Sequence, residues 1–115
     1  MKIKKQQEYI LCAAIHYNDG KQYKGQPYGI NTGFVISGRR HNNCFELLEQ
    51  ILSNFNSKYI HKNGMGFMTS SGYFVDRKVG YKIAEKAGQL LLGSNKDKSM
   101  QILTSEDLYY DGEGL

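Results

Sequence analysis

The arginines of this chain are the side chains best suited to hold a ligand. The chain has fifteen Lys and Arg residues, of which only three are Arg. They lie in two motifs, "GRRHNN" with Arg39 and Arg40, and "FVDRK" with Arg77. A guanidinium group is a planar fork of N–H donors that fits phosphate or carboxylate and stacks on nucleobases, whereas Lys is a mobile point charge. This segregation favours an anionic ligand.

Both arginine motifs stand at the start of a predicted helix. A lone cation there is disfavoured by about 0.3–1 kcal/mol, because the helix dipole is positive at its N-terminus. A phosphate held between the guanidinium groups and the free backbone N–H groups would reverse that balance. Alternatively, Arg39 and Arg40 are solvated or pair with Glu46, Glu106 or Asp107, and such surface pairs contribute little stability.

Catalytic and metal-binding patterns are weak. His41 follows Arg40 and can hydrogen-bond near a phosphate, and Cys44 lies at a helix start that could stabilise a thiolate. A nucleotide-degrading enzyme using His41 or Cys44 therefore stays open as an alternative, although no nucleophile elbow or GxGxxG fingerprint supports it. The three His residues have no metal-ligand spacing. We expect no catalytic residue, no metal and no cofactor.

Composition indicates a folded protein with a small ligand. The 115 residues are 40% hydrophobic, with a net charge of +4 and a pI near 9.0. That charge also permits a second alternative, a module that binds nucleic acid or a host protein. A groove for long nucleic acid would show more interleaving of basic and aromatic residues, so a small nucleotide suits the chain better.

The two cysteines and the N-terminus indicate a cytoplasmic protein. Cys12 and Cys44 lack CxxC spacing and no secretory leader precedes them, so we expect reduced thiols. The apolar run after the basic N-terminus is too short to span a bilayer, so we expect no membrane partner.

The elements that position the motifs follow from apolar patterning. Strands are predicted at 9–16 and 32–37, on either side of a glycine- and tyrosine-bearing loop, 18–33. A hairpin is predicted around 70–72, and a final strand or short helix at 100–110. This order predicts an α+β fold in which a small antiparallel sheet packs with two amphipathic helices. We expect one nucleotide-binding domain over 1–115, with frayed ends at 1–8 and 111–115.

Each predicted helix has a start signal. The first is expected to run from Asn43 to about 56, with Asn43 and Glu46 in a capping box. The second has Asp76 as its N-cap and is expected to stop at Gly93. Within it, Gly80 is less favourable than Ala by about 0.5–1 kcal/mol, so close packing or ligand approach is expected there.

Aromatic residues offer a stacking surface for a purine. The candidates are Phe74, the tyrosines at 17–28, and Tyr109 or Tyr110, since each stacked ring contributes about 1–3 kcal/mol. The commoner alternative is that these rings fill or cover the core.

The combined motifs resemble a known family. The succession "ILCAAIHY", "GFVISGRRHNNC", "GFMTSSGYFVDRKVGYKIAEKAGQ" and "LTSEDLY", which spans 9–110, is similar to small phage and prophage proteins. In particular it resembles the Thoeris anti-defence sponge family that sequesters cyclic ADP-ribose isomers.

This resemblance implies a function. Members of the family bind the cyclic ADP-ribose signal made by a bacterial TIR-domain protein and hold it without cleaving it, so they are sponges and not enzymes. Some assemble as homodimers or as hexamers built from dimers, and bind cyclic trinucleotides of CBASS at a second site. The implied location is the cytoplasm of the infected bacterium.

The resemblance also implies the ligand-binding residues. Matched by motif, they are Arg39, Arg40, His41, Thr69, Ser70, Phe74, Asp76 and Arg77. A sponge needs slow ligand release, so we expect the ligand to be enclosed by a second subunit or by the loop 18–33.

Overall fold

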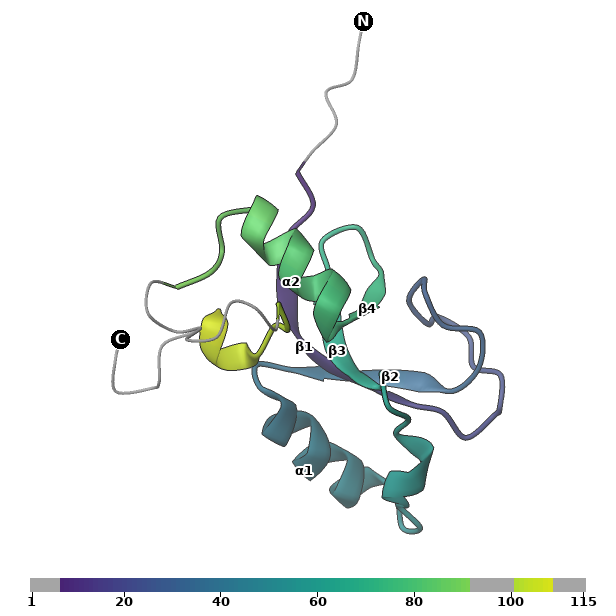
Figure 1. Cartoon of the computed structure of the whole chain (residues 1–115). Coiled ribbons are helices and arrows are strands. Elements are labelled where there is room, and N and C mark those ends of the chain that lie inside the picture. Colours follow the sequence, from purple (N-terminus) through teal and green to yellow (C-terminus); the bar gives the residue numbers. More distant parts are fainter. Residues whose placement is uncertain (1–6, 92–100, 109–115) are drawn as a thin grey trace, which may run out of the picture.

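A four-stranded sheet and two helices form the scaffold, and the computed structural model describes residues 7–91 and 101–108 (Figure 1). The sheet is antiparallel throughout, with strand order β2-β1-β3-β4. The α+β fold predicted from the sequence is therefore confirmed. The elements are β1 Ile10–Tyr17, β2 Phe34–Gly38, α1 His41–Ile51, the 3₁₀ turn η1 Ser57–Tyr59, β3 Met65–Thr69, β4 Phe74–Asp76, α2 Arg77–Lys86 and the 3₁₀ turn η2 Ser105–Asp107.

Both helices pack on the same face of the sheet. Side chains alternate between the two faces of a strand, so Ala13, Ile15 and Tyr17 of β1 share one face. Ala13 belongs to an apolar cluster with Tyr81 of α2, whereas Ile15 and Tyr17 belong to a cluster with Leu48 of α1. Figure 1 shows α1 next to β2, and α2 apart from it beside β3 and β4. The two helices therefore cover different parts of this face: α1 packs on β1 and β2, and α2 packs mainly on β3 and β4.

The loop 18–33 reaches the far edge of the sheet. It leaves β1 and enters β2, yet Tyr28 forms a parallel bridge with Tyr73 beside β4. The Tyr28 N–H donates to the Gly72 carbonyl at 3.0 Å, and the Phe74 N–H donates to the Tyr28 carbonyl at 2.8 Å. The sheet order places β2 and β4 at opposite edges, so the loop spans the sheet and its contacts hold it there.

The first helix begins earlier and ends earlier than the sequence predicts. It starts at His41, with Arg40 as an N-cap residue in extended conformation. The capping-box prediction for Asn43 and Glu46 is wrong, because Asn43 occupies the third helical position and its Oδ1 accepts the Arg40 N–H at 3.1 Å. The helix ends at Ile51 because Leu52 turns extended, and not near 56.

The second helix confirms its predicted start but not its predicted stop. The Asp76 carboxylate accepts the Val79 N–H at 2.9 Å, as an N-cap should. The helix ends at Lys86, well before Gly93, because Gly88 adopts a left-handed conformation with φ +72°. The Gln89 N–H then donates to the Ala84 carbonyl at 2.8 Å, which completes a Schellman stop.

The other sequence predictions agree with smaller shifts. The two N-terminal strands end one residue later than predicted, and the hairpin between β3 and β4 turns at Ser70–Gly72. The final element is the turn η2. The predictions for 1–6, 109–110 and 111–115, frayed ends and stacking tyrosines among them, lie outside the described residues.

Gly66 and Gly80 differ in how much room the structure leaves for the methyl group of an alanine. A Cβ on Gly66 would overlap the Val75 carbonyl oxygen and lie 2.9 Å from Phe74 Cζ, so the backbone itself would have to move. A Cβ on Gly80 would lie 3.3 Å from side-chain carbons of Leu103 and Phe67, which can adjust. This close packing of α2 explains the glycine in its interior.

We expect Gly66→Ala to lower the free energy of unfolding by about 1–3 kcal/mol or more, as overpacking does. Gly80→Ala is the control, since a gain of about 1 kcal/mol in helix propensity offsets its milder crowding. Urea denaturation of both variants measures the difference. Equal stability of the two variants would contradict the close approach at Gly66.

Candidate functional site

The two arginine motifs meet in one cleft. Arg40 and His41 at the start of α1 and Arg77 at the start of α2 line a cleft of about 290 Å³. They are joined there by the turn η2 and by Met65 of β3. The complete lining is Arg40, His41, Asn42, Met65, Arg77, Thr104, Ser105 and Glu106. Residues that are far apart in the sequence therefore combine cations, hydroxyl groups and one carboxylate at a single place.

Strand pairing brings the two helix starts together. Gly66 lies opposite Asp76 in the β3–β4 register, and Asp76 is both the last residue of β4 and the N-cap of α2. The Gly66 carbonyl accepts a hydrogen bond from His41 Nε2 at 2.8 Å. Both helix N-termini are thus tied to one point of β3. The orphan N–H groups of helix starts favour anions, so two such starts reinforce the cationic side chains.

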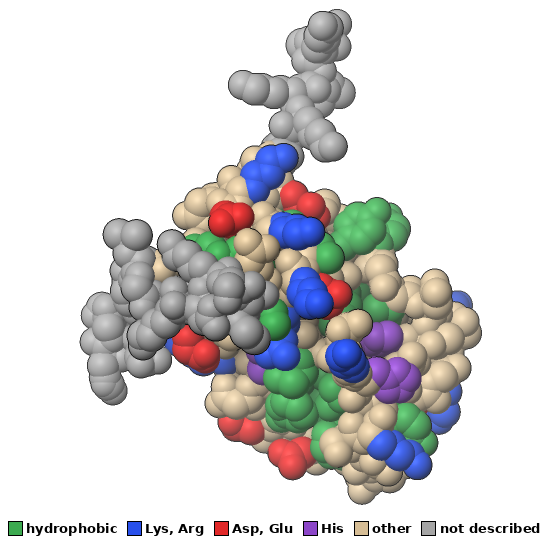
Figure 2. Space-filling model, viewed as in Figure 1, with side chains coloured by type: hydrophobic (Ala, Val, Ile, Leu, Met, Phe, Trp, Pro, Cys, Tyr) green, Lys and Arg blue, Asp and Glu red, His purple; other side chains and the backbone are tan. Residues whose placement is uncertain are grey.

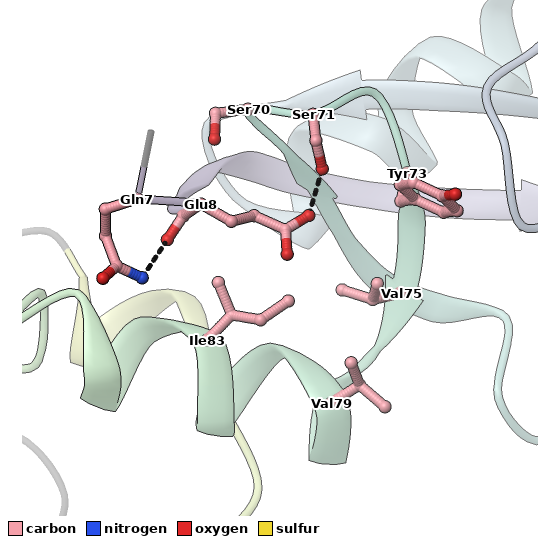
Figure 3. Close-up of a pocket in the computed structure, with 8 residues that line it drawn as sticks. All are labelled: Gln7, Glu8, Ser70, Ser71, Tyr73, Val75, Val79 and Ile83. Atoms are coloured by element: carbon pink, nitrogen blue, oxygen red, sulfur yellow. Dashed lines mark hydrogen bonds between the residues drawn. The ribbon is translucent and has the colours of Figure 1, made fainter. Parts of the chain in front are cut away.

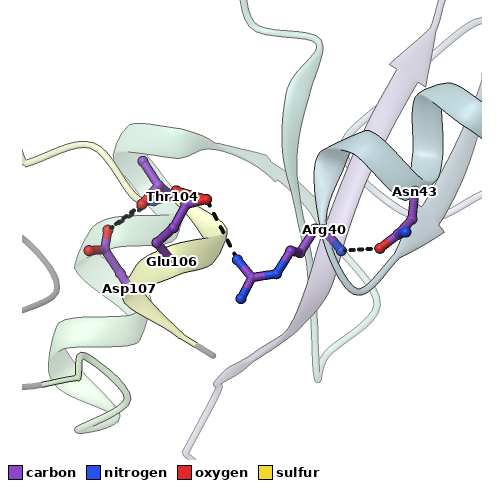
Figure 4. A network of polar contacts seen from close by, with 5 residues as sticks. All are labelled: Arg40, Asn43, Thr104, Glu106 and Asp107. Carbon is purple, nitrogen blue, oxygen red and sulfur yellow. Dashed lines mark hydrogen bonds and ion pairs between the residues drawn. The ribbon is translucent and has the colours of Figure 1, made fainter. Parts of the chain in front are cut away.

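The turn η2 forms the opposite wall, and its backbone is well anchored. The Leu103 N–H donates to the Arg77 carbonyl at 3.0 Å. Buried Asp107 accepts the Thr104 N–H at 2.9 Å and the Thr104 hydroxyl at 3.1 Å. From this turn Glu106 extends to Arg40, and Figure 4 shows the two side chains pointing toward each other. The Glu106 Oε1 to Arg40 Nη1 distance is 3.6 Å. The alternative pairing of Arg40 with Glu106 is therefore present.

His41 is a neutral hydrogen-bonding residue in this cleft. Because a carbonyl oxygen can only accept, the bond to Gly66 fixes the proton on Nε2 and leaves Nδ1 as an acceptor. Burial lowers the His41 pKa from 6.5, and the positive charge of Arg77 acts in the same direction. The Gly66 hydrogen bond and Glu106 oppose this shift. The imidazole edge also contacts the Phe67 ring, with 5.1 Å between ring centroids.

A second, smaller hollow adjoins the cleft. It measures about 140 Å³ and shares Met65 and Arg77 with the first. Its remaining lining is Lys62, Asn63, Asp76, Lys78 and Ile102. Figure 2 shows Lys and Arg side chains running down the middle of this face with acidic side chains beside them, and α2 contributes Arg77, Lys78, Lys82 and Lys86. The two hollows together are lined by Arg40, Lys62, Arg77 and Lys78 and by the carboxylates of Asp76 and Glu106, so positive charge is in excess there.

Four of the predicted ligand-binding residues lie elsewhere. Arg39 is exposed and does not line the cleft. Phe74 is buried against His16, with 5.7 Å between ring centroids. Thr69 is buried, and its hydroxyl accepts the Tyr73 N–H at 3.2 Å. Phe74 is therefore a core residue, and Thr69 holds the hairpin turn.

Ser70 lines a different cavity, of about 540 Å³, beside the β3–β4 hairpin and α2 (Figure 3). Its floor is apolar, formed by Val75, Val79 and Ile83. The charged group in its lining is Glu8, which accepts a hydrogen bond from the Ser71 hydroxyl. An anionic carboxylate and an apolar floor make this larger cavity a poor place for a phosphate.

The loop 18–33 contributes no residue to the lining of the cleft or of the adjoining hollow. Its described contacts outside the loop are with the β3–β4 hairpin, with β1 and β2, and with η1. The expectation that this loop covers the ligand is not supported by these positions, so enclosure of a ligand would need another chain segment or subunit.

Both cysteines are free thiols, as the sequence predicts, and neither is activated. Burial raises the pKa of Cys44 to about 11 and also raises that of Cys12. The Cys44 thiol points to the carbonyl oxygens of Ala13 and Arg40, at 3.9 and 3.6 Å. The suggestion that the helix start stabilises a thiolate at Cys44 is therefore wrong.

Sequence reasoning missed the wall opposite the arginines. Thr104 and Ser105 lie in "LTSEDLY" but are not among the predicted ligand-binding residues, and Glu106 is predicted only as a possible salt-bridge partner. The signal was the "TSED" pattern, in which Thr and Asp three residues apart form a capping box. Within 7–91 and 101–108, no group of three or more His, Cys, Asp or Glu residues is placed to hold a metal. The same residues contain no helix long and apolar enough to cross a membrane.

We predict a pH-dependent stability that comes from His41. Its folded pKa lies below 6.5, so the unfolded state binds more protons as the pH falls through 6.5, and the free energy of unfolding decreases. Urea denaturation from pH 7.5 to 5 should show a steeper loss for the wild type than for His41→Gln. An imidazole titration by NMR with a midpoint at or above 6.5 would contradict this environment.

Comparison with known proteins gives one result. The family model described as Phage T4 y16D protein matches residues 9–109. No curated protein and no solved structure gives a significant match. The matched range contains both arginine motifs and the η2 wall, so it includes all described residues of the cleft. The chain therefore belongs to the Phage T4 y16D protein family, a family of phage proteins.

Proposed function

We propose that this phage protein binds a cyclic ADP-ribose isomer in the cleft between α1, α2 and η2 and holds it without cleaving it. The observation that carries this proposal is the meeting of Arg40, Arg77 and two helix starts in one cleft. A pyrophosphate is the group that such a set of donors fits. By sequestering the TIR-derived signal in the cytoplasm of the infected bacterium, the protein would block Thoeris defence.

The rest of the cleft supports a nucleotide over a simple anion. Ribose hydroxyl groups can donate to the neutral His41 Nδ1 and to Glu106, and can bond with Ser105. Met65 offers an apolar surface between the cleft and its adjoining hollow. Charge alone would suit any polyanion, whereas these acceptors need a ligand that carries both phosphate and hydroxyl groups.

Retention without chemistry agrees with the state of the candidate nucleophile. The Cys44 pKa of about 11 keeps its thiol protonated at neutral pH. Ligand pockets are usually about 300–1,000 Å³, and the cleft of about 290 Å³ is at the low end of this range. We therefore propose a homodimer or larger homo-oligomer in which a second copy completes the enclosure, as slow release requires.

A capture experiment tests the function directly. The purified protein is mixed with cyclic ADP-ribose isomers and cyclic trinucleotides, free ligand is removed, and the protein is heat-denatured to release what it holds. Intact cyclic ADP-ribose, identified by mass and chromatography, is the expected product. Linear products would indicate an enzyme, and recovery of nothing would contradict the proposal.

We predict that Arg40→Ala and Arg77→Ala each weaken binding of the captured nucleotide by roughly 10- to 100-fold, the range for charge-assisted hydrogen bonds. Arg→Lys at either position should restore little, because the planar fork is lost. Lys82→Ala, which removes an exposed charge from α2, is the control. Calorimetric titration measures the affinities, and unchanged binding in both Ala variants would exclude this cleft.

A further inference from the structure

Glu106 is a carboxylate placed among the cations of the cleft. It lines the same hollow as Arg40, His41 and Arg77, and its carboxylate lies 3.6 Å from the Arg40 guanidinium. The Glu106 side chain is 67% exposed. The Arg40 side chain is 21% exposed, and an ion pair with one member as exposed as Glu106 contributes little to stability. The fold therefore has no strong energetic need for a negative charge at this position.

The backbone under Glu106 is held by other groups. The hydrogen bonds from Thr104 to the Asp107 carboxylate close the turn. The Leu103 N–H donates to the carbonyl of Arg77, the first residue of α2. The Leu91 N–H also donates to the Asp107 carbonyl at 2.9 Å. These hydrogen bonds hold the turn without the Glu106 side chain, which lines the cleft.

A carboxylate beside Arg40 changes which anions the cleft can accept. A phosphate that binds Arg40 competes with Glu106 and is repelled by it at short range. The repulsion is compensated only if the ligand also brings a hydrogen-bond donor to the carboxylate. At neutral pH inorganic pyrophosphate offers only an acidic P–OH proton on an ion of higher charge than a pyrophosphate diester, whereas a sugar-linked pyrophosphate also carries sugar hydroxyl groups that can donate to the carboxylate.

We propose that Glu106 determines specificity, so that the cleft selects phosphates linked to a hydroxyl-bearing sugar over bare phosphate or pyrophosphate. The inference rests on the proposed function only in taking the Arg40–Arg77 cleft as the ligand site. It is a form of selection by an unfavourable contact: the bare ion is rejected because its higher charge lies beside the Glu106 carboxylate with no sugar hydroxyl group to compensate.

The test compares Glu106→Gln with the wild type in calorimetric titrations with inorganic pyrophosphate and with ADP-ribose. Glutamine keeps the size of the side chain and removes its charge. We expect pyrophosphate to bind roughly fivefold more tightly, the upper range for an exposed charge pair. ADP-ribose should gain less than pyrophosphate or lose affinity, because the amide replaces an acceptor of its hydroxyl groups.

Glu49→Gln is the matched control, since it makes the same charge change on the exposed surface of α1. Glu49 is nine residues beyond Arg40, or about 13 Å along the helix axis. It should change neither affinity. Thermal unfolding should show that both variants keep the stability of the wild type, because the hydrogen bonds of η2 remain.

An equal gain for both ligands in Glu106→Gln would reduce Glu106 to a general electrostatic effect and overturn the inference. The absence of any gain for pyrophosphate, including no binding by either protein, would overturn it as well. The outcome is separable from the proposed function: a protein that captures no cyclic ADP-ribose but gains pyrophosphate selectively in Glu106→Gln keeps the inference and loses the function.

Discussion

The position of Gly66 is the constraint on which the fold and the cleft both depend. The residue has no room for a side chain, because the Val75 backbone and the Phe74 ring occupy the space where a Cβ would lie. Its carbonyl binds His41 at the start of α1, and its pairing partner Asp76 caps the start of α2. One close strand contact thus fixes two helix N-termini relative to each other, and with them the separation of the two arginines.

Local signals in the sequence predict most of the fold. The capping aspartate, the hairpin turn and the apolar stripes of both helices depend on neighbouring residues, so they can be recognised without knowing the tertiary structure. Where two residues could both end a helix, or one residue could take either of two capping roles, the sequence does not show which of them the structure uses. Gly88 ends α2 before Gly93 because it is the first glycine able to close a Schellman motif. Asn43 could be the N-cap or the third residue of α1. It is the third residue, because the extended Arg40 is the N-cap and donates its N–H to the Asn43 side chain.

The site is harder to predict, because its walls come from distant segments. The segregation of the arginines into two motifs at helix starts singled out Arg40 and Arg77, and the structure places both of them, with His41, in the lining of one cleft. Phe74 and Thr69 stand close to Arg77 in the sequence, but both are buried: Phe74 packs against His16, and the Thr69 hydroxyl accepts the Tyr73 N–H within the hairpin. Motif membership does not determine the direction of a side chain. The opposing wall at η2 depends on a backbone hydrogen bond from Leu103 to Arg77, which no pattern in the sequence indicates.

Two adjacent residues of the turn η2 have different roles, one in folding and one in lining the cleft. Asp107 is buried and holds the backbone through its hydrogen bonds, whereas Glu106 is exposed and lines the cleft. A substitution at the exposed position leaves the hydrogen bonds of the turn intact, and the sheet is not involved in them. Single substitutions at exposed positions of this wall can therefore change the charge and the hydrogen-bonding groups that line the cleft. The hydrogen bonds that fold the turn stay unchanged in such a variant, so the chemistry of the cleft can change independently of the fold.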